Sequence, residues 1–190
     1  MASDFTLARL NMVESQIRTA DVTDLPLQDV LRVAPRETVA PADKAHLAYA
    51  DAEVEYAPGR WLLRPRDIGK LLQALRPREG ERALAIAAPY AALVLEGMGL
   101  NVERLDAEDL TQLSGGGYDL IVCEGAVDAA PRAWTDALAP AGRLGVVERT
   151  GPVGHAVIYR RNEDGLGRRA VFDSTPPVLS GFETRQSFAL

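Results

Sequence analysis

The sequence predicts an α/β fold with a mostly parallel sheet, an antiparallel hairpin near the C-terminus and a helical N-terminal extension. Three observations support this fold class. Apolar residues follow a helical period up to residue 79, apolar runs then alternate with helical segments, and the tail carries two strand-like segments around a polar turn. Strands and helices that alternate in this way are typical of a parallel sheet covered on both faces.

Residues 1–79 are predicted to form short helices that pack beside the core. Thr23 or Asp24 can cap the second of them, and Pro65 opens the last, whose apolar residues recur at three- and four-residue spacing. Residues 51–64 have no clean period, so a loop is expected there. The expected helices cover residues 5–18, 24–31, 41–47 and 65–76.

Residues 80–190 are predicted to form the sheet itself, as one structural unit with the helices before it. The clearest buried strand reads Tyr-Asp-Leu-Ile-Val-Cys, and a polar Asn-Glu-Asp-Gly turn separates the two strands of the hairpin. A further strand is expected over residues 182–190. The expected strands are 83–87, 102–105, 118–123, 143–147, 155–161 and 169–172, with helices at 90–98 and 131–138.

The composition favours one domain of ordinary size with a proper hydrophobic core, since 47% of the 190 residues are hydrophobic and 25% are charged. The formal charge of −6 argues against non-specific nucleic-acid binding, which depends on neutralising phosphates. The chain has no polybasic run, no apolar stretch near the roughly 18 residues of a membrane span, and charged residues where a signal segment would be apolar. We therefore expect a cytoplasmic protein that binds neither nucleic acid nor membrane.

Metal and hydrolase sites are not expected. His46, His155 and Cys123 are far apart in the sequence, whereas zinc needs several nitrogen and sulfur ligands at close spacing. The single cysteine excludes an intrachain disulfide. No G-x-S-x-G elbow occurs, and the triple glycine 115–117 precedes a strand, whereas a phosphate loop opens a helix.

A ligand site is predicted at the carboxyl ends of the parallel strands, where open α/β sheets bind ligands. The turn 87–90 follows the first strand, Asp106 follows the second and Glu124 follows the next. An acid after the second strand commonly holds a ribose hydroxyl, but Asp106 can equally cap a turn in the run Asp-Ala-Glu-Asp. Both readings of Asp106 stay open.

Several segments, taken in order, resemble the protein-L-isoaspartate O-methyltransferase family in its short bacterial form. They are NMVESQIRTADVTD, VAPRE, AYAD, YDLIVCEGAVDAAP, LAPAGRLGVVERTGPVGHAVIYRR and the closing RRAVFDSTPPVLSGFETRQSFAL. The resemblance implies a class I, Rossmann-like methyltransferase fold and S-adenosylmethionine as cofactor. It also implies methyl transfer to the side carboxylate of an isoaspartyl residue in a damaged protein.

The cofactor loop departs from the family pattern, which reads roughly D-x-G-x-G-x-G. Matched without a gap, the acid falls on Ala85 and the glycines on Ala87, Pro89 and Ala91. Glycine lets a backbone approach a ligand and adopt positive φ, whereas proline lacks the amide hydrogen. If cofactor binding is retained, the resemblance assigns it to Ala87, Pro89, Tyr90, Asp106 and Glu124.

Two further departures concern the middle of the chain and the substrate loop. Only 12 residues separate Asp106 from Asp119, where the family has an additional helix and strand, so Asp106 matches the acid of either the second or the third strand. The two hydroxyl residues of the family's substrate loop fall on Trp61 and Leu63. The substrate-loop candidates are Tyr49, Asp51, Trp61, Leu63 and Arg64.

Two functions follow from these patterns. The first is a family member that has lost cofactor binding and methyl transfer and acts by binding a protein partner of unknown identity. The alternative is a working S-adenosylmethionine-dependent methyltransferase that acts on an isoaspartyl or another carboxylate substrate. No residue is assigned as catalytic, and the apolar cluster 61–63 is either packed under the helices or a contact site.

Overall fold

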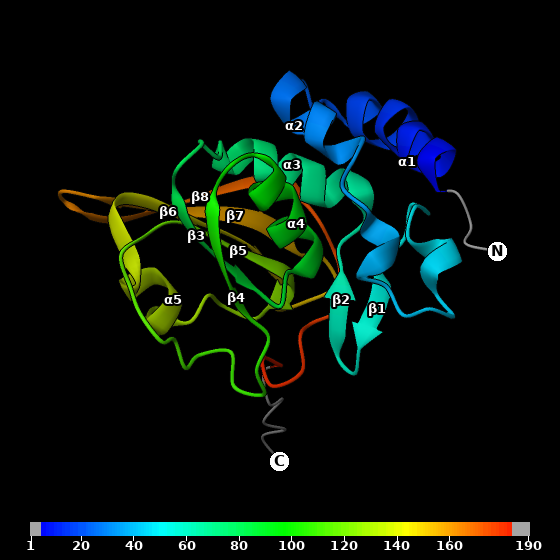
Figure 1. The fold of residues 1–190 in the computed structure, drawn as a ribbon. Coiled ribbons are helices and arrows are strands. Elements are labelled where there is room, and N and C mark those ends of the chain that lie inside the picture. Colours follow the sequence, from blue (N-terminus) through cyan, green and yellow to red (C-terminus); the bar gives the residue numbers. More distant parts are fainter. Residues whose placement is uncertain (1–4, 184–190) are drawn as a thin grey trace, which may run out of the picture.

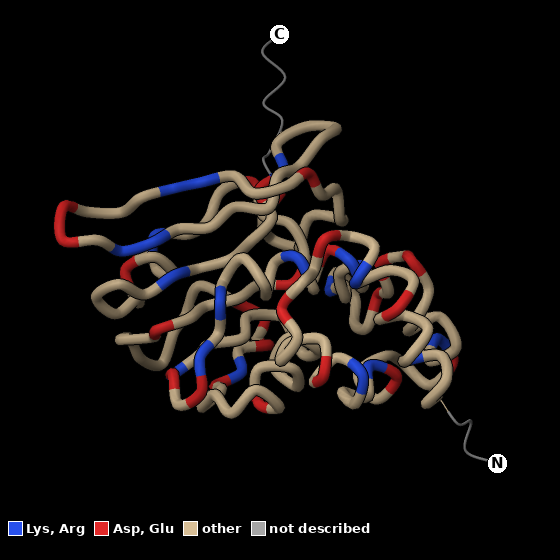
Figure 2. Tube along the Cα trace, turned by 90° about the horizontal axis from the view of Figure 1, so that it is seen from above, with Lys and Arg blue, Asp and Glu red and all other residues tan. Residues whose placement is uncertain are grey.

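A six-stranded sheet forms the centre of the computed structural model, which describes residues 5–183. The strand order is β4-β3-β5-β6-β7-β8, with the first four strands parallel and the last two joined as an antiparallel hairpin that projects beyond the rest of the sheet (Figures 1 and 2). The predicted fold class is confirmed. The strands are β3 (Arg82–Ile86), β4 (Asn101–Leu105), β5 (Tyr118–Val127), β6 (Leu138–Glu148), β7 (His155–Asn162) and β8 (Gly165–Asp173).

Helices α3 (Pro65–Leu75) and α4 (Pro89–Gly97) cover one face of the sheet, and the N-terminal layer lies over them (Figure 1). α3 approaches β6 closely at Gly145, where a Cβ would lie 2.8 Å from Leu75 Cδ1. Of the two expected caps, Thr23 and Asp24, it is Asp24 that caps α2 (Leu25–Leu31), since its side chain accepts a hydrogen bond from the Leu27 amide. The N-terminal layer contains α1 (Thr6–Met12), η1 (Val13–Ile17), η2 (Arg18–Ala20) and α2 (Leu25–Leu31).

The opposite face of the sheet is covered by the short helix α5 (Arg132–Asp136) and by the connection over residues 106–117. Trp134 is fully buried there, and its indole Nε1 donates to the Leu110 carbonyl at 2.7 Å. The connection contains no helix or strand, so β4 is the edge of the sheet. Among the described residues no strand lies beyond β4, in keeping with the short connection between Asp106 and Asp119.

The segment predicted as a loop over residues 51–64 instead contains a hairpin of β1 (Val54–Ala57) and β2 (Arg60–Leu62). Gly59 makes its turn with φ +67°. The prediction was wrong because strands of four and three residues are too short to show a period. Residues 1–79 are therefore not wholly helical, and they share one core cluster with the sheet.

Four further expectations are corrected or fall partly outside the described residues. The first helix changes to a π-helix at Val13, and hydroxyls of Ser15 and Thr19 bond to carbonyls one turn earlier, which competes with the regular helix ladder. Only the 3₁₀ turn η4 (Ala45–Leu47) forms within 41–47, beside η3 (Arg36–Thr38). α5 ends before Leu138, which begins β6. Residues 182 and 183 are not in a strand, and 184–190 lie outside the described residues.

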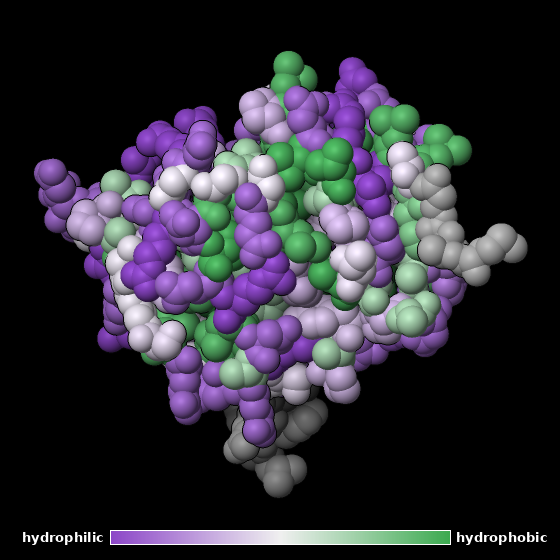
Figure 3. Space-filling model, in the orientation of Figure 1, coloured by the Kyte–Doolittle hydropathy of each residue, from purple (hydrophilic) through white to green (hydrophobic). Residues whose placement is uncertain are grey.

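Exposed large apolar side chains gather mainly on the N-terminal layer. Figure 3 shows apolar residues over α1 and α2 at the upper right of this face, and others over α4 at its centre. Among residues 5–183, no helix is both long and apolar enough to cross a membrane. The exposed apolar residues of the N-terminal layer and its connections are Leu7, Leu10, Leu25, Val33 and Leu47.

Candidate functional site

The buried carboxylate of Glu124 lies where the carboxyl end of β3 meets β5. One of its oxygens, Oε1, accepts the Ala91 amide at 2.7 Å, and the other, Oε2, accepts the Leu63 amide at 3.1 Å. The Tyr90 amide faces the same carboxylate and acts to lower its pKa. Glu124 is fully inaccessible to solvent, so it joins β5, α4 and the end of β2 from inside the protein.

The first turn of α4 has no amide left for a ligand. Pro89 is its first residue and has no N–H, the Ala91 amide donates to Glu124, and the Tyr90 amide faces the same carboxylate. The Ala92 amide bonds to the Ala88 carbonyl within the helix. A helix N-terminus binds anions through these first amides, so in this protein Glu124 occupies that position.

Ala87 occupies the turn between β3 and α4 in a left-handed conformation, with φ +44°. Its amide donates to the Leu105 carbonyl at the end of β4 at 2.8 Å, and its side chain is fully buried. A positive φ favours glycine, so the backbone has kept a glycine-like shape while the side chain adds a Cβ.

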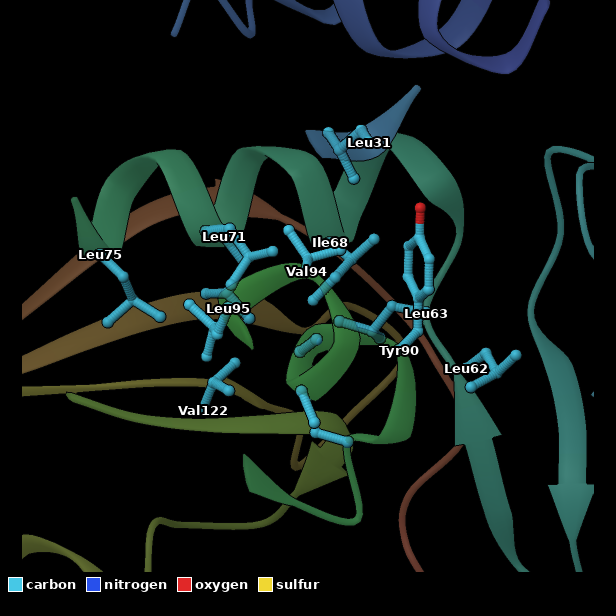
Figure 4. Packing of buried hydrophobic residues seen from close by; sticks show 14 of the residues in the cluster. Leu31, Leu62, Leu63, Ile68, Leu71, Leu75, Tyr90, Val94, Leu95 and Val122 are labelled. Atoms are coloured by element: carbon cyan, nitrogen blue, oxygen red, sulfur yellow. The ribbon is translucent and has the colours of Figure 1, made fainter. Parts of the chain in front are cut away.

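A buried arginine stands beside this turn. Arg36 donates through Nε to the Ala48 carbonyl at 2.7 Å, donates through Nη2 to the Leu63 carbonyl, and lies 4.7 Å from the centre of the Tyr90 ring. Figure 4 shows the Tyr90 hydroxyl pointing away from the sheet, toward the N-terminal layer, with Leu63 near the other end of the ring. Arg36 therefore ties the helical layer to the end of β2.

Burial raises the pKa of Glu124 above its ordinary value, although the positive charge of Arg36 and the three amide donors oppose the shift. Burial likewise lowers the pKa of Arg36, opposed by Glu124. Burial and the Glu124 charge raise the pKa of the neighbouring Cys123 thiol, so it is no candidate nucleophile.

Asp106 lies exposed at the carboxyl end of β4, which is the neighbour of β3 and hence the second parallel strand in sequence. The Tyr56 hydroxyl donates to it at 2.9 Å, and Arg60 Nε lies 3.6 Å from its other oxygen. Arg60 Nη2 also donates to the Ala107 carbonyl at 3.0 Å. The β1–β2 hairpin is thus fastened onto the end of β4.

The tail covers the same end of the sheet from the opposite face. Leu179 is fully buried against Gly125, and its amide donates to the Ala126 carbonyl at 2.8 Å. The Ser180 amide donates to the Gly59 carbonyl of the hairpin turn at 3.3 Å. Hairpin and tail therefore meet across the carboxyl edge of the sheet.

The structure brings Leu63, Tyr90 and Glu124 together, but it gives the other substrate-loop candidates different partners. Tyr49 donates its hydroxyl to Glu37, and Arg64 lies within ion-pair distance of Glu53 and Asp67. Trp61 is half-buried on β2, opposite Glu55. Asp51 is exposed and lines a separate cavity of about 400 Å³ near η1.

Three residues of this region were not selected from the sequence as site residues: Arg36, Tyr56 and Arg60. Arg36 lies in the segment VAPRE that carried part of the family resemblance, which is the one signal that pointed to it. Arg60 is largely buried, and its Nη2 donates to the Ala107 carbonyl. No group of three or more metal-binding side chains occurs in the part of the chain that the structure describes.

Two curated relatives match almost the whole chain. A protein-L-isoaspartate O-methyltransferase of Methylorubrum extorquens is 30% identical over 208 residues, covering 93% of this chain and 90% of the relative. One of Methylorubrum populi is 31% identical over 205 residues, covering 92% of this chain and 96% of the relative. The chain belongs to the protein-L-isoaspartate O-methyltransferase family. No protein-family model matches it.

Solved structures of this methyltransferase family share the fold. A putative protein-L-isoaspartate O-methyltransferase from Plasmodium falciparum, solved with S-adenosyl-L-homocysteine, superposes with a TM-score of 0.71 at 14% identity over 90% of this chain and 97% of its own. A second protein-L-isoaspartate O-methyltransferase structure gives a TM-score of 0.71 at 15% identity, over 92% of this chain and 67% of its own. The predicted class I methyltransferase fold is therefore confirmed.

Proposed function

We propose that this member of the protein-L-isoaspartate O-methyltransferase family does not bind S-adenosylmethionine productively and acts as a protein-binding module. The observation that carries the proposal is that the buried Glu124 accepts the Ala91 amide and lies against the Tyr90 amide in the first turn of α4. A cofactor carboxylate that needed these donors would have to displace a side chain that belongs to the core.

The surrounding residues also fit the cofactor poorly. Ala87 keeps the positive φ of a glycine but places a Cβ on the turn, and Pro89 supplies no amide. Asp106, the residue suited to a ribose, is already bonded to Tyr56 and close to Arg60. Leu63 and Leu179 are fully buried at this edge, so apolar side chains fill space near the strand ends.

The substrate side supports the same proposal. The attacking isoaspartyl carboxylate is ionised at neutral pH, so the task of such an enzyme is to position it in a dry site. Trp61 and Leu63 provide no hydroxyl, and Arg64 lies between Glu53 and Asp67, at 3.2 and 3.1 Å. An arginine already engaged by two carboxylates is a weak replacement for the missing donors.

One observation favours the alternative of a working methyltransferase. Asp106 is exposed at the end of the second strand, where a ribose-binding acid is expected, and Tyr56 and Arg60 come from a short hairpin that could be displaced. Methyl transfer would then require the hairpin to release Asp106.

A methyl-transfer assay separates the two. The protein is incubated with an isoaspartyl peptide and methyl-labelled cofactor, with the Methylorubrum extorquens relative as positive control and an enzyme-free blank. The proposal expects label transfer equal to the blank. Transfer clearly above the blank that is lost in Arg64→Ala would overturn it and assign Arg64 to substrate binding.

A further inference from the structure

Four arginines without side-chain partners gather at the amino end of the sheet, on the face covered by α3. Arg76 and Arg78 follow α3, Arg160 lies on β7 and Arg169 on β8. All four are exposed, and within residues 5–183 none of their guanidinium groups makes a hydrogen bond or ion pair. Basic segments along the β7–β8 hairpin are visible in Figure 2.

Two other arginines nearby, Arg143 and Arg168, form ion pairs with glutamates, unlike these four. Arg143 lies 2.7 Å from Glu81, and it also donates to the carbonyls of Leu75 and Arg76. Arg168 pairs with Glu148. The unpaired charge is thus concentrated on Arg76, Arg78, Arg160 and Arg169.

These arginines line two adjoining cavities. One, of about 570 Å³, lies between the end of α3 and strands β6–β8, and the other, of about 720 Å³, continues along α3 and β8 to Lys70 and Phe172. Arg76, Arg78 and Arg169 line both. Ile158 is buried and Val171 is half-buried in the lining, so the groove combines positive charge with apolar surface.

β8 is also an open edge of the sheet. It is nine residues long and pairs with β7 on one side only. Apart from the pairing with β7, no backbone group between Gly165 and Asp173 forms a backbone hydrogen bond to another described part of the chain. Such an edge can accept an extended segment as an additional strand, with backbone bonds providing affinity and side chains providing specificity.

We propose that the groove along β8 and α3 docks an extended acidic protein segment, which pairs with the β8 edge and places carboxylates among the four arginines. Guanidinium groups bind carboxylates in a bidentate geometry. Nucleic acid is disfavoured because single strands bind through exposed stacking rings, whereas Phe172, the one aromatic ring that the described residues place in the groove, is half-buried with Lys70 over it. This proposal names the surface and the kind of partner for the binding role proposed above, and it rests on that role.

The test uses the full chain and a fluorescein-labelled peptide of about eight residues, the length of an ordinary strand, that alternates glutamate with valine. Fluorescence anisotropy is expected to show saturable binding that weakens steeply with added salt. Arg160→Glu/Arg169→Glu is expected to weaken binding at least about tenfold. Arg132→Glu is the control. Arg132 is exposed on α5, outside the groove, and this change reverses one charge just as each substitution in the double variant does. It is expected to leave binding unchanged.

Three results would overturn the inference: no binding of the acidic peptide, equal binding by the double variant, or tighter binding of a single-stranded thymidine oligomer. Equal binding of a peptide interrupted by proline would overturn the pairing with β8, since proline removes the amides that pairing needs. Glu124 does not line the groove, so a failure of peptide binding leaves the proposed loss of cofactor binding intact. A cofactor titration tests that loss separately.

Discussion

Single residues at and beside the β3–α4 turn hold a strained backbone and a buried carboxylate. Ala87 holds a left-handed conformation that costs an L-residue about 1–2 kcal/mol. Glu124 holds a buried carboxylate against three amides. Both features persist only because the surrounding packing fixes them, and each gives a measurable signature.

Ala87→Gly is expected to leave the free energy of unfolding unchanged or to raise it by up to about 1 kcal/mol, because glycine relieves the left-handed strain while losing one methyl group. Ala88→Gly is the matched control, since Ala88 has φ −134° and needs no glycine. It should destabilise the protein by about 0.5–1 kcal/mol. Urea unfolding measures both, and an equal loss of stability in both variants would contradict the argument.

The raised pKa of Glu124 makes the stability of the protein depend on pH. Its pKa is raised in the folded protein, so the protonated form is favoured on folding. Stability from this group is fully present below its ordinary pKa and is lost as pH rises from that value through the folded pKa. Glu124→Gln should remove this decline from the unfolding free energy measured between acidic and neutral pH.

Glu148→Gln provides a contrast of opposite sign. Burial opposes ionisation of Glu148, but bonds from Tyr159, Arg168 and the Ala130 amide outweigh it and lower its pKa. Its contribution is present above the ordinary pKa and is lost as pH falls through the folded value. The two variants should therefore change the slope of stability with pH in opposite directions, and slopes that change alike would refute the assignment of Glu124.

At the scale of elements, the β1–β2 hairpin and the tail close the carboxyl edge of the sheet. The hairpin contacts Asp106 and Ala107, and the tail places Leu179 on Gly125. Gly125 has φ +114°, and a Cβ there would lie 2.6 Å from Leu179 Cδ2. The tail can cover the strand only because this residue is glycine.

Gly125→Ala should therefore destabilise the protein by at least about 1–3 kcal/mol through overpacking and backbone strain. Amide hydrogen exchange should increase most at Ala126 and Leu179, whose backbones are bonded to each other. Gly151→Ala is the control, because a Cβ there meets nothing within 4 Å and its φ is not left-handed. Unchanged exchange at Leu179 would show that the tail is not held by this contact.

The same elements show how far sequence reasoning reaches. The strands of the main sheet were predicted from short runs of apolar residues, and α3 from apolar residues at three- and four-residue spacing. The hairpin was missed because its strands are short, and its anchors to Asp106 are about 50 residues away in sequence. Glu124 was expected just after a strand but lies within β5, which runs on to Val127; its partners Leu63 and Ala91 are 61 and 33 residues away, and no local pattern encodes that pairing.

At the scale of the whole molecule, the two ends of the sheet differ. The carboxyl end, where a methyltransferase fold binds its ligand, is closed by Glu124, by the β1–β2 hairpin and by the tail. The amino end is open, with unpaired arginines and a free strand edge. The fold has kept the family's framework, and we propose that its binding surface lies at the amino end.

Calorimetric titration of the wild-type protein with S-adenosylhomocysteine tests the closed site most directly, with the Methylorubrum extorquens relative as positive control. Loss of two charge-assisted backbone contacts, at about 1.5–3 kcal/mol each, weakens binding by a hundredfold or more. We predict no measurable binding heat at ligand concentrations that saturate the relative. A micromolar dissociation constant with one site per chain would contradict it and would show that Glu124 yields its place to the cofactor.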